Sequence, residues 1–267
     1  MPLRPSPPGF LLTRRLGLGL ALGLALPAQA QIADLAEAIN LAGRQRMLSQ
    51  RLSKAWLARA QPNAHPQALP VLQRSIEQFE RQLNDLQGYA PNAAIRQTYA
   101  DLDSAWNAFR QQLQEAPAAR PAAQALLQAD ARVLTLAHQG TQQLEALATR
   151  PTGRWVNVAG RQRMLSQRMA NFYFAAAWQL EVASAREEIK LARQEFLSAA
   201  SALRQAPETS PRIADELALA EGQWVFFDAA LKAEGNSPKQ LHEVFVSSEN
   251  LLAVMDRVTR LYAAQKA

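Results

Sequence analysis

The decapeptide AGRQRMLSQR occurs twice in this chain, letter for letter, at residues 42–51 and 159–168. An asparagine lies two residues before each copy, as Asn40 and Asn157. The rest of the two halves has diverged widely. Self-similarity at this spacing predicts a duplicated fold. Because arginine, glutamine and serine are repeated unchanged, the repeat also predicts a duplicated site.

The first thirty residues have the pattern of an export signal. Arg4, Arg14 and Arg15 precede an apolar stretch at 16–26, and Ala-Gln-Ala at 28–30 fits a cleavage site. The apolar stretch is too short for a typical membrane-spanning helix. We therefore predict a periplasmic protein cleaved near Ala30. An uncleaved anchor and the twin-arginine export route are the alternatives.

Charge and cysteine content narrow the class of protein. Residues 1–30 contain three arginines and no acidic residue, so their removal lowers the net charge from +6 to +3. A charge of this size does not indicate nucleic acid or a membrane surface as a partner. There is no cysteine, so no disulfide is expected. No later segment is apolar enough to cross a membrane.

The remaining chain is predicted to be all-α. It is rich in good helix formers, and no stretch alternates in the manner of a strand. Proline- and glycine-containing breaks predict helices near 32–60, 67–87, 93–115 and 121–149. We expect two tandem four-helix units, at 31–150 and 151–267, related by a pseudo-two-fold axis.

The second unit has weaker breaks. A helix is expected to begin near Arg154. Ser184 with Glu187 has the pattern of a capping box and predicts the start of the next helix. Ser210-Pro211 predicts the seventh helix, and Ser237 with Gln240 predicts a second capping box at the eighth. At matching positions, Phe79 corresponds to Phe196 and Trp106 to Trp224.

On a helix, each decapeptide has two distinct faces. One face is apolar and is expected to pack into its own unit: Leu41, Leu48, Leu52 and Ala55, and Val158, Leu165, Met169 and Phe172. The opposite face is half small and half polar: Ile39, Gly43, Arg46, Gln50 and Ser53, and Val156, Gly160, Arg163, Gln167 and Ala170. A glycine inside a helix costs about 1 kcal/mol against alanine, so it is useful where a backbone or ligand comes close.

The simplest way to satisfy both polar faces is to bring them together. Arg46 and Arg163 then meet near the pseudo-two-fold axis. Two buried guanidiniums repel each other and lose hydration, and a small planar oxyanion between them relieves both costs. Backbone near Gly43 and Gly160 is expected to approach the same anion.

A purely structural interpretation competes with this one. Helical arginines are usually solvated or paired with acids, and repeats usually retain packing residues. Packing alone is expected to preserve leucine and methionine and to let Gln45, Ser49 and Gln50 drift. Four flanking arginines are predicted to pair with acids on neighbouring helices: Arg44, Arg51, Arg161 and Arg168.

The segment 40–51 resembles the P-box helix of PilJ-type sensor domains, the N-terminal domains of type IV pilus methyl-accepting transducers. It is also similar to the P-box of NarX/NarQ-type nitrate and nitrite sensor kinases. The resemblance implies a periplasmic four-helix bundle that dimerises and binds nitrate between its first helices. The family's ligand arginine lies three residues after the P-box glycine. That position is Arg46 after Gly43 and Arg163 after Gly160.

The resemblance also implies how a signal leaves the domain. No transmembrane helix, HAMP-like segment or kinase follows Ala267. We therefore expect a free-standing sensor domain with both halves of the dimer in one chain. It would act on a membrane-bound transducer or transporter.

Other chemistry is weakly supported. The three histidines, His65, His138 and His242, are scattered, and no metal-ligand motif, catalytic triad or phosphate loop is present. We expect no enzyme activity, metal or cofactor.

The sequence thus predicts a sensor or binding protein for a small oxyanion, nitrate or nitrite first. The predicted ligand residues are Gly43, Arg46, Gln50, Gly160, Arg163 and Gln167, flanked by Asn40, Arg44, Arg51, Asn157, Arg161 and Arg168. The alternative is a structural or assembly protein of the envelope or pilus system, in which the two P-box helices form only an interface.

Overall fold

The computed structural model describes Met1 and residues 32–61, 64–114, 120–233 and 235–265. The predicted export signal and its cleavage site lie outside these residues, apart from Met1. The described part of the chain contains α-helices and no strand. Among these helices, none is long and apolar enough to span a membrane.

The described residues form eight helices, four in each half of the chain, and residues 31–267 form one compact unit. The first four are α1 (Leu35–Ala60), α2 (Ala68–Tyr89), α3 (Ala93–Gln114) and α4 (Arg120–Glu145). The second four are α5 (Thr152–Ala177), α6 (Val182–Gln205), α7 (Pro211–Lys232) and α8 (Pro238–Ala263). The all-α prediction is confirmed. The division at residue 150 into two separate units stays a prediction.

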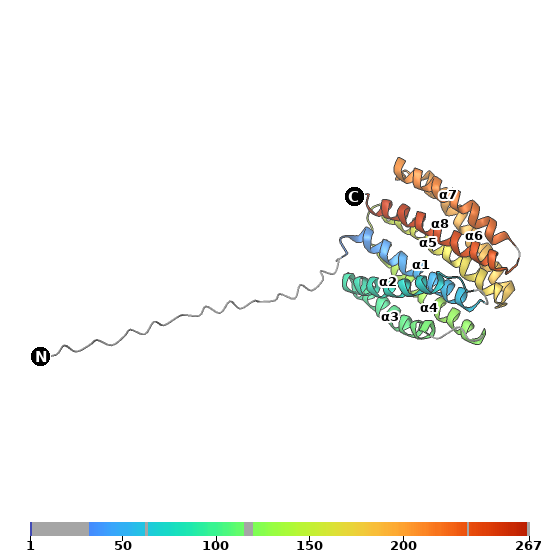
Figure 1. Cartoon of the computed structure of the whole chain (residues 1–267). Helices are drawn as coiled ribbons and strands as arrows, with labels where there is room; N and C mark the ends of the chain where they lie inside the picture. The colour runs from blue at the N-terminus through green and yellow to red at the C-terminus, as the bar shows by residue number, and fades with distance from the viewer. Residues whose placement is uncertain (2–31, 62–63, 115–119, 234, 266–267) are drawn as a thin grey trace. The chain divides into compact units, whose positions relative to one another are not determined.

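The two repeated helices, α1 and α5, pack against each other at the centre (Figure 1). Helices α2 and α4 flank α1, and α3 packs on α4. In the same way α6 and α8 flank α5, and α7 packs on α8. Both central helices carry buried residues on all sides, including many polar ones. Their polar groups therefore need internal hydrogen-bond partners.

Matching positions in the two halves have matching surroundings. Phe79 stacks on Trp106 at 4.1 Å between ring centroids, and Phe196 stacks on Trp224 at 4.5 Å. We call two residues counterparts when they are 117 positions apart in α1/α5 and α2/α6, or 118 apart in α3/α7 and α4/α8.

Most of the predicted helix starts are confirmed. Ser210 accepts a hydrogen bond from the backbone N–H of Ile213, with Pro211 in the first turn. Ser237 and Gln240 form a reciprocal capping box. The capping box predicted at Ser184 is wrong, because α6 begins two residues earlier, at Val182.

The early start of α6 follows from the tight connection after α5. Gln179 and Glu181 have positive φ angles of 62° and 40°, and Leu180 between them is buried. This buried leucine fixes the turn and brings the chain into α6 before Ser184.

Candidate functional site

Arg46 and Arg163 lie together over the two glycines of the repeat. A Cβ atom on Gly43 would be 3.1 Å from Arg46 Nη2 and 3.6 Å from Arg163 Nη2. A Cβ atom on Gly160 would be 3.1 Å from Arg163 Nη2 and 3.8 Å from Arg46 Nη2. Both arginine residues are fully buried. Glycine at these positions leaves room for both guanidiniums between the helices.

Each arginine also bonds to the asparagine that precedes the other copy. Arg46 Nη2 donates to Asn157 Oδ1 at 2.7 Å, and Arg163 Nη2 donates to the carbonyl oxygen of Asn40 at 3.0 Å. The asparagines are therefore part of the contact between α1 and α5. One contributes its side chain and the other its backbone.

The two arginines differ in their second hydrogen-bond partner. Arg163 Nη1 donates to Asp256 Oδ1 at 2.6 Å, and Arg44 Nη2 donates to the same oxygen at 2.7 Å. Arg46 Nη1 faces His138 Nδ1 at 3.2 Å. His138 on α4 and Asp256 on α8 are counterparts, so a histidine replaces a carboxylate in the first half. Among the described residues, no carboxylate forms a salt bridge with Arg46.

This difference sets the charges at the site. Burial, then Arg161 and Arg163, lowers the pKa of Arg46 to about 9, so Arg46 stays protonated at neutral pH. Burial and then Arg46 lowers the pKa of His138 to about 4, so His138 is neutral. A guanidinium only donates hydrogen bonds, so His138 Nδ1 accepts from Arg46 and the ring proton is on Nε2.

Each of these guanidiniums has one buried donor without a partner. The Nε atoms of Arg46 and Arg163 have no hydrogen-bond partner among the described residues. Burial without a partner costs about 1–3 kcal/mol for a polar group, and more for a charged one. An acceptor that reached Arg46 Nε would offset this cost.

Two of the repeated polar residues have a structural role that the sequence did not reveal. Gln45 Nε2 donates to the carbonyl of Phe79 at 3.2 Å, and Gln162 Nε2 donates to the carbonyl of Phe196 at 2.9 Å. Ser49 Oγ donates to the carbonyl of Arg46 at 3.0 Å within its own helix. The expectation that packing alone lets Gln45 and Ser49 drift is therefore wrong, since buried hydrogen bonds explain their identity.

The two predicted ligand glutamines belong to neighbouring polar clusters. Gln50 Nε2 donates to both carboxylate oxygens of Asp130 at 2.9 Å. Gln167 Nε2 donates to the carbonyl of Ser248 at 2.9 Å, and its Oε1 accepts from Lys54 at 2.7 Å. In the described part of the chain, neither glutamine side chain forms a hydrogen bond with the guanidinium of Arg46 or Arg163.

The flanking arginines pair with acids on neighbouring helices, as predicted. The pairs are Arg44 with Asp256, Arg51 with Glu249, Arg161 with Glu195, and Arg168 with Glu188. The first two cross to α8 in the other half, whereas the last two stay with α6 in their own half. These four arginines are therefore structural.

Sequence reasoning missed His138, Asp256 and Asp130 as members of the central polar contacts. The change from His138 to Asp256 is visible once α4 and α8 are aligned at an offset of 118, which the Trp106–Trp224 match already indicates. The three histidines are also less scattered than expected, because His65 Nε2 and His242 Nδ1 are 3.0 Å apart.

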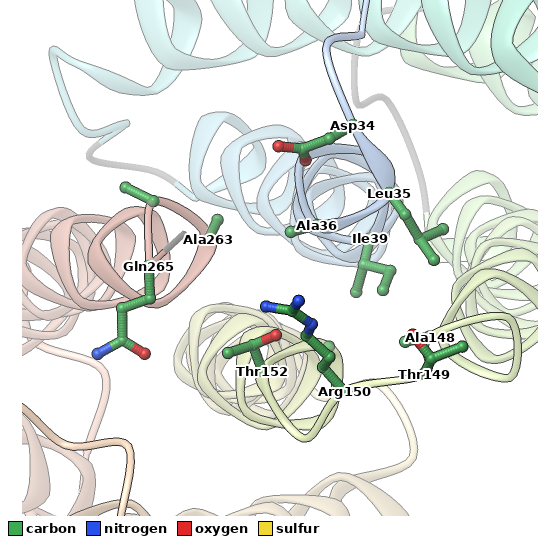
Figure 2. A pocket seen from close by; sticks show the side chains of 12 residues that line it. Asp34, Leu35, Ala36, Ile39, Ala148, Thr149, Arg150, Thr152, Ala263 and Gln265 are labelled. Carbon is green, nitrogen blue, oxygen red and sulfur yellow. The ribbon is translucent and has the colours of Figure 1, made fainter. Parts of the chain in front are cut away.

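One pocket among the described residues lies away from the arginine pair. It has a volume of about 580 Å³ and lies where α1 and α5 begin and α8 ends. Figure 2 shows Arg150 and Thr152 on the α5 side of this pocket, opposite Asp34 and Ile39 of the α1 segment. None of the six predicted ligand residues lines it.

Comparison with known proteins agrees with the duplicated architecture. The family model PilJ, described as type IV pili methyl-accepting chemotaxis transducer N-term, matches residues 28–132 and again 149–246. Each match begins ahead of one decapeptide copy. Neither the curated proteins nor the solved structures gave a match. Because the two matches cover most of its length, the chain belongs to the PilJ family of type IV pili methyl-accepting chemotaxis transducer N-terminal domains.

Proposed function

We propose that this PilJ-family domain is a periplasmic sensor that binds a small oxyanion at Arg46, nitrate or nitrite first. Family membership supports the sensor role. The anion proposal rests on one observation, which is that Arg46 is fully buried and pairs with no carboxylate among the described residues. Arg163 beside it adds a second positive charge, which Asp256 partly offsets.

The chemistry of the guanidinium favours a planar oxyanion. Two parallel N–H donors of one guanidinium match two oxygens of such an anion. Arg46 Nε has no partner, and the donor parallel to it, Nη2, donates to the neutral side chain of Asn157, which an anion can replace. Since His138 is only partly buried, its side of the site is the route by which we expect the anion to enter.

Anion binding at this point would change contacts between three helices. Arg46 on α1 bonds to His138 on α4 and to Asn157 on α5. A ligand that replaces either bond alters how α1 packs against its neighbours. A ligand shifts a conformational equilibrium only through such differential contacts. We propose that a membrane-bound partner reads this change.

The test is thermal unfolding of the protein with sodium nitrate, nitrite or sulfate against sodium chloride at equal ionic strength. Nitrate or nitrite is expected to raise Tm, and Arg46→Gln is expected to remove the rise. Arg204→Gln is the matched control, because Arg204 is an exposed arginine paired with Glu221. The proposal is wrong if no oxyanion raises Tm, or if Arg46→Gln responds like the wild type.

A histidine-to-aspartate change tests the same site without removing the arginine. His138→Asp gives Arg46 the carboxylate partner that Arg163 already has. We expect this variant to be folded and to lose its response to the anion. A full response in His138→Asp would contradict binding at Arg46.

The outer helix α7 supports the alternative of a structural or assembly protein. Val225 and Phe226 are 63% and 68% exposed, and neighbouring apolar side chains on a surface often mark a partner interface. This alternative predicts no effect of oxyanions on Tm. It also predicts a complex in envelope extracts that Phe226→Ser weakens.

A further inference from the structure

The second half of the molecule contains an internal binding site for an ammonium group. Lys54 is fully buried, and its Nζ donates to Gln167 Oε1 at 2.7 Å, Ser248 Oγ at 3.0 Å and Glu249 Oε1 at 2.6 Å. The same Nζ lies 4.5 Å from the ring centroid of Phe245. The ammonium of Lys54 is thus held by three oxygens and one aromatic face.

The corresponding place in the first half receives no lysine from α5. The counterpart of Lys54 is Asn171, which has a shorter and uncharged side chain. The counterparts of Gln167, Ser248, Glu249 and Phe245 are Gln50, Asp130, Ala131 and Leu127. All four of these line a pocket of about 280 Å³ between α4, α5 and α6. The pocket therefore occupies the position at which the other half surrounds an ammonium.

The acceptors beside this pocket are suited to a cation. Asp130 is 3% exposed and receives hydrogen bonds from Gln50 at 2.9 Å and from Asn171 Nδ2 at 3.3 Å. Both donors are neutral, and no salt bridge to Asp130 is present among the described residues. Asn171 Oδ1 is buried without a hydrogen-bond partner in the described part of the chain. Burial raises the pKa of Asp130 to about 6, and a nearby cation would favour its ionised form.

The rest of the pocket is acidic and partly apolar. Glu181 and Glu188 also line it, and its one lining cation, Arg168, pairs with Glu188 at 2.7 Å. Phe172 and two leucines supply apolar surface. A ligand with one positive charge and a short hydrocarbon chain matches this combination.

We propose that this pocket binds a small primary amine, with the ammonium donating to Asp130 and the hydrocarbon chain lying against Leu127, Leu180 and Phe172. Lys54, whose ammonium fills the matching place in the second half, shows the chemistry that such a ligand reproduces. The site is independent of the proposed oxyanion site, although Gln50 lies one helical turn from Arg46 on α1.

The probe is n-butylammonium chloride, which reproduces the side chain of Lys54. Calorimetric titration at pH 7.5 is expected to give saturable heat, and the amine is expected to raise Tm. Tetramethylammonium chloride, which cannot donate a hydrogen bond, and sodium chloride are expected to give neither effect. Loss of one charge-assisted hydrogen bond in Asp130→Asn is expected to weaken binding by at least about tenfold.

Two further variants complete the test. Asp215→Asn removes an exposed carboxylate on α7 and is expected to bind the amine like the wild type. Asn171→Lys supplies the ammonium from the protein, so we expect a higher Tm and no response to the amine. If Asn171→Lys does not fold, amine binding by the wild type is compared at pH 7.5 and pH 5. Binding is expected to weaken at pH 5, because Asp130 is then protonated.

The proposal is overturned if the wild type gives no saturable heat, if tetramethylammonium acts like n-butylammonium, or if Asp130→Asn binds as tightly as the wild type. The nitrate response of Asp130→Asn separates the two sites. An unchanged nitrate response with lost amine binding supports this inference. If the wild type binds the amine but no oxyanion, the amine proposal stands and the oxyanion proposal is wrong.

Discussion

Arg46 and Arg163 are surrounded by the same ten-residue sequence and yet have different partners. Arg163 shares Asp256 with Arg44, and burial, which opposes ionisation of Asp256, is outweighed by these two cations, so its pKa is lowered. Arg46 has a neutral histidine at the matching position. The repeated sequence thus supplies both guanidiniums, whereas residues on α4 and α8 set the charge around each one.

His138 predicts how stability depends on pH. Its pKa is about 4 in the folded protein and about 6.5 in the unfolded chain, so the unfolded state binds the proton more tightly. The stability that His138 contributes is therefore complete above about pH 6.5 and is lost as the pH falls toward 4. We expect Tm to fall less between pH 7 and pH 5 in His138→Gln than in the wild type.

Asp130 opposes this trend, because its raised pKa favours the folded state as the pH falls below about 6. Asp130 is present in both the wild type and His138→Gln. The comparison of His138→Gln with the wild type cancels its contribution. Parallel Tm profiles for the two proteins would contradict the assigned state of His138.

Gly43 of the repeat and Gly222 of α7 are expected to give opposite results when each is changed to alanine. A Cβ on Gly222 in α7 meets nothing within 4 Å, so Gly222→Ala is expected to stabilise by about 1 kcal/mol through helix propensity. A Cβ on Gly43 approaches both buried guanidiniums, so Gly43→Ala is expected to lower the free energy of unfolding. Urea unfolding measures the free energy of unfolding of both variants. Equal stabilisation by the two changes would show that the two guanidiniums can move aside from the added Cβ at no cost.

At the scale of a helix, substitutions at Ser237 and Ser184 show which of the two serines caps a helix. Ser237 closes a capping box at α8, so Ser237→Ala is expected to cost about 1 kcal/mol. Ser184 lies exposed inside α6, and Ser184→Ala is expected to change stability by less than about 0.5 kcal/mol. Thermal or urea unfolding of both variants checks the difference, and a larger loss from Ser184→Ala would contradict the observed start of α6.

The helices were predictable from sequence where a local signal specifies them. Proline and capping residues predicted α7 and α8 correctly, and the polar helical faces of the two repeat copies predicted that Arg46 and Arg163 meet. The start of α6 depends on the buried Leu180, a tertiary contact that overrides the local pattern at Ser184. His138 and Asp256 come from α4 and α8, so their contacts with the arginines follow from packing between helices distant in sequence.

At the scale of the whole molecule, the two halves depend on each other for burial. Helix α1 packs against α5, and Arg44, Arg51 and Lys54 on α1 pair with acids on α8 of the other half. We expect residues 31–150 produced alone to dimerise or to be unfolded. Light scattering and circular dichroism check this, and a stable folded monomer would show that the division at residue 150 separates independent domains.

A fused chain can carry a histidine on α4 and an aspartate at the matching position of α8, whereas a homodimer cannot. A homodimer carries any substitution in both subunits. An anion between its subunits therefore has two equivalent orientations or two equivalent sites. Here one arginine has a carboxylate partner and, among the described residues, the other has none. An anion bound at Arg46 would therefore have one fixed orientation, and its titration would follow a simple hyperbola with one equivalent per chain, without cooperativity.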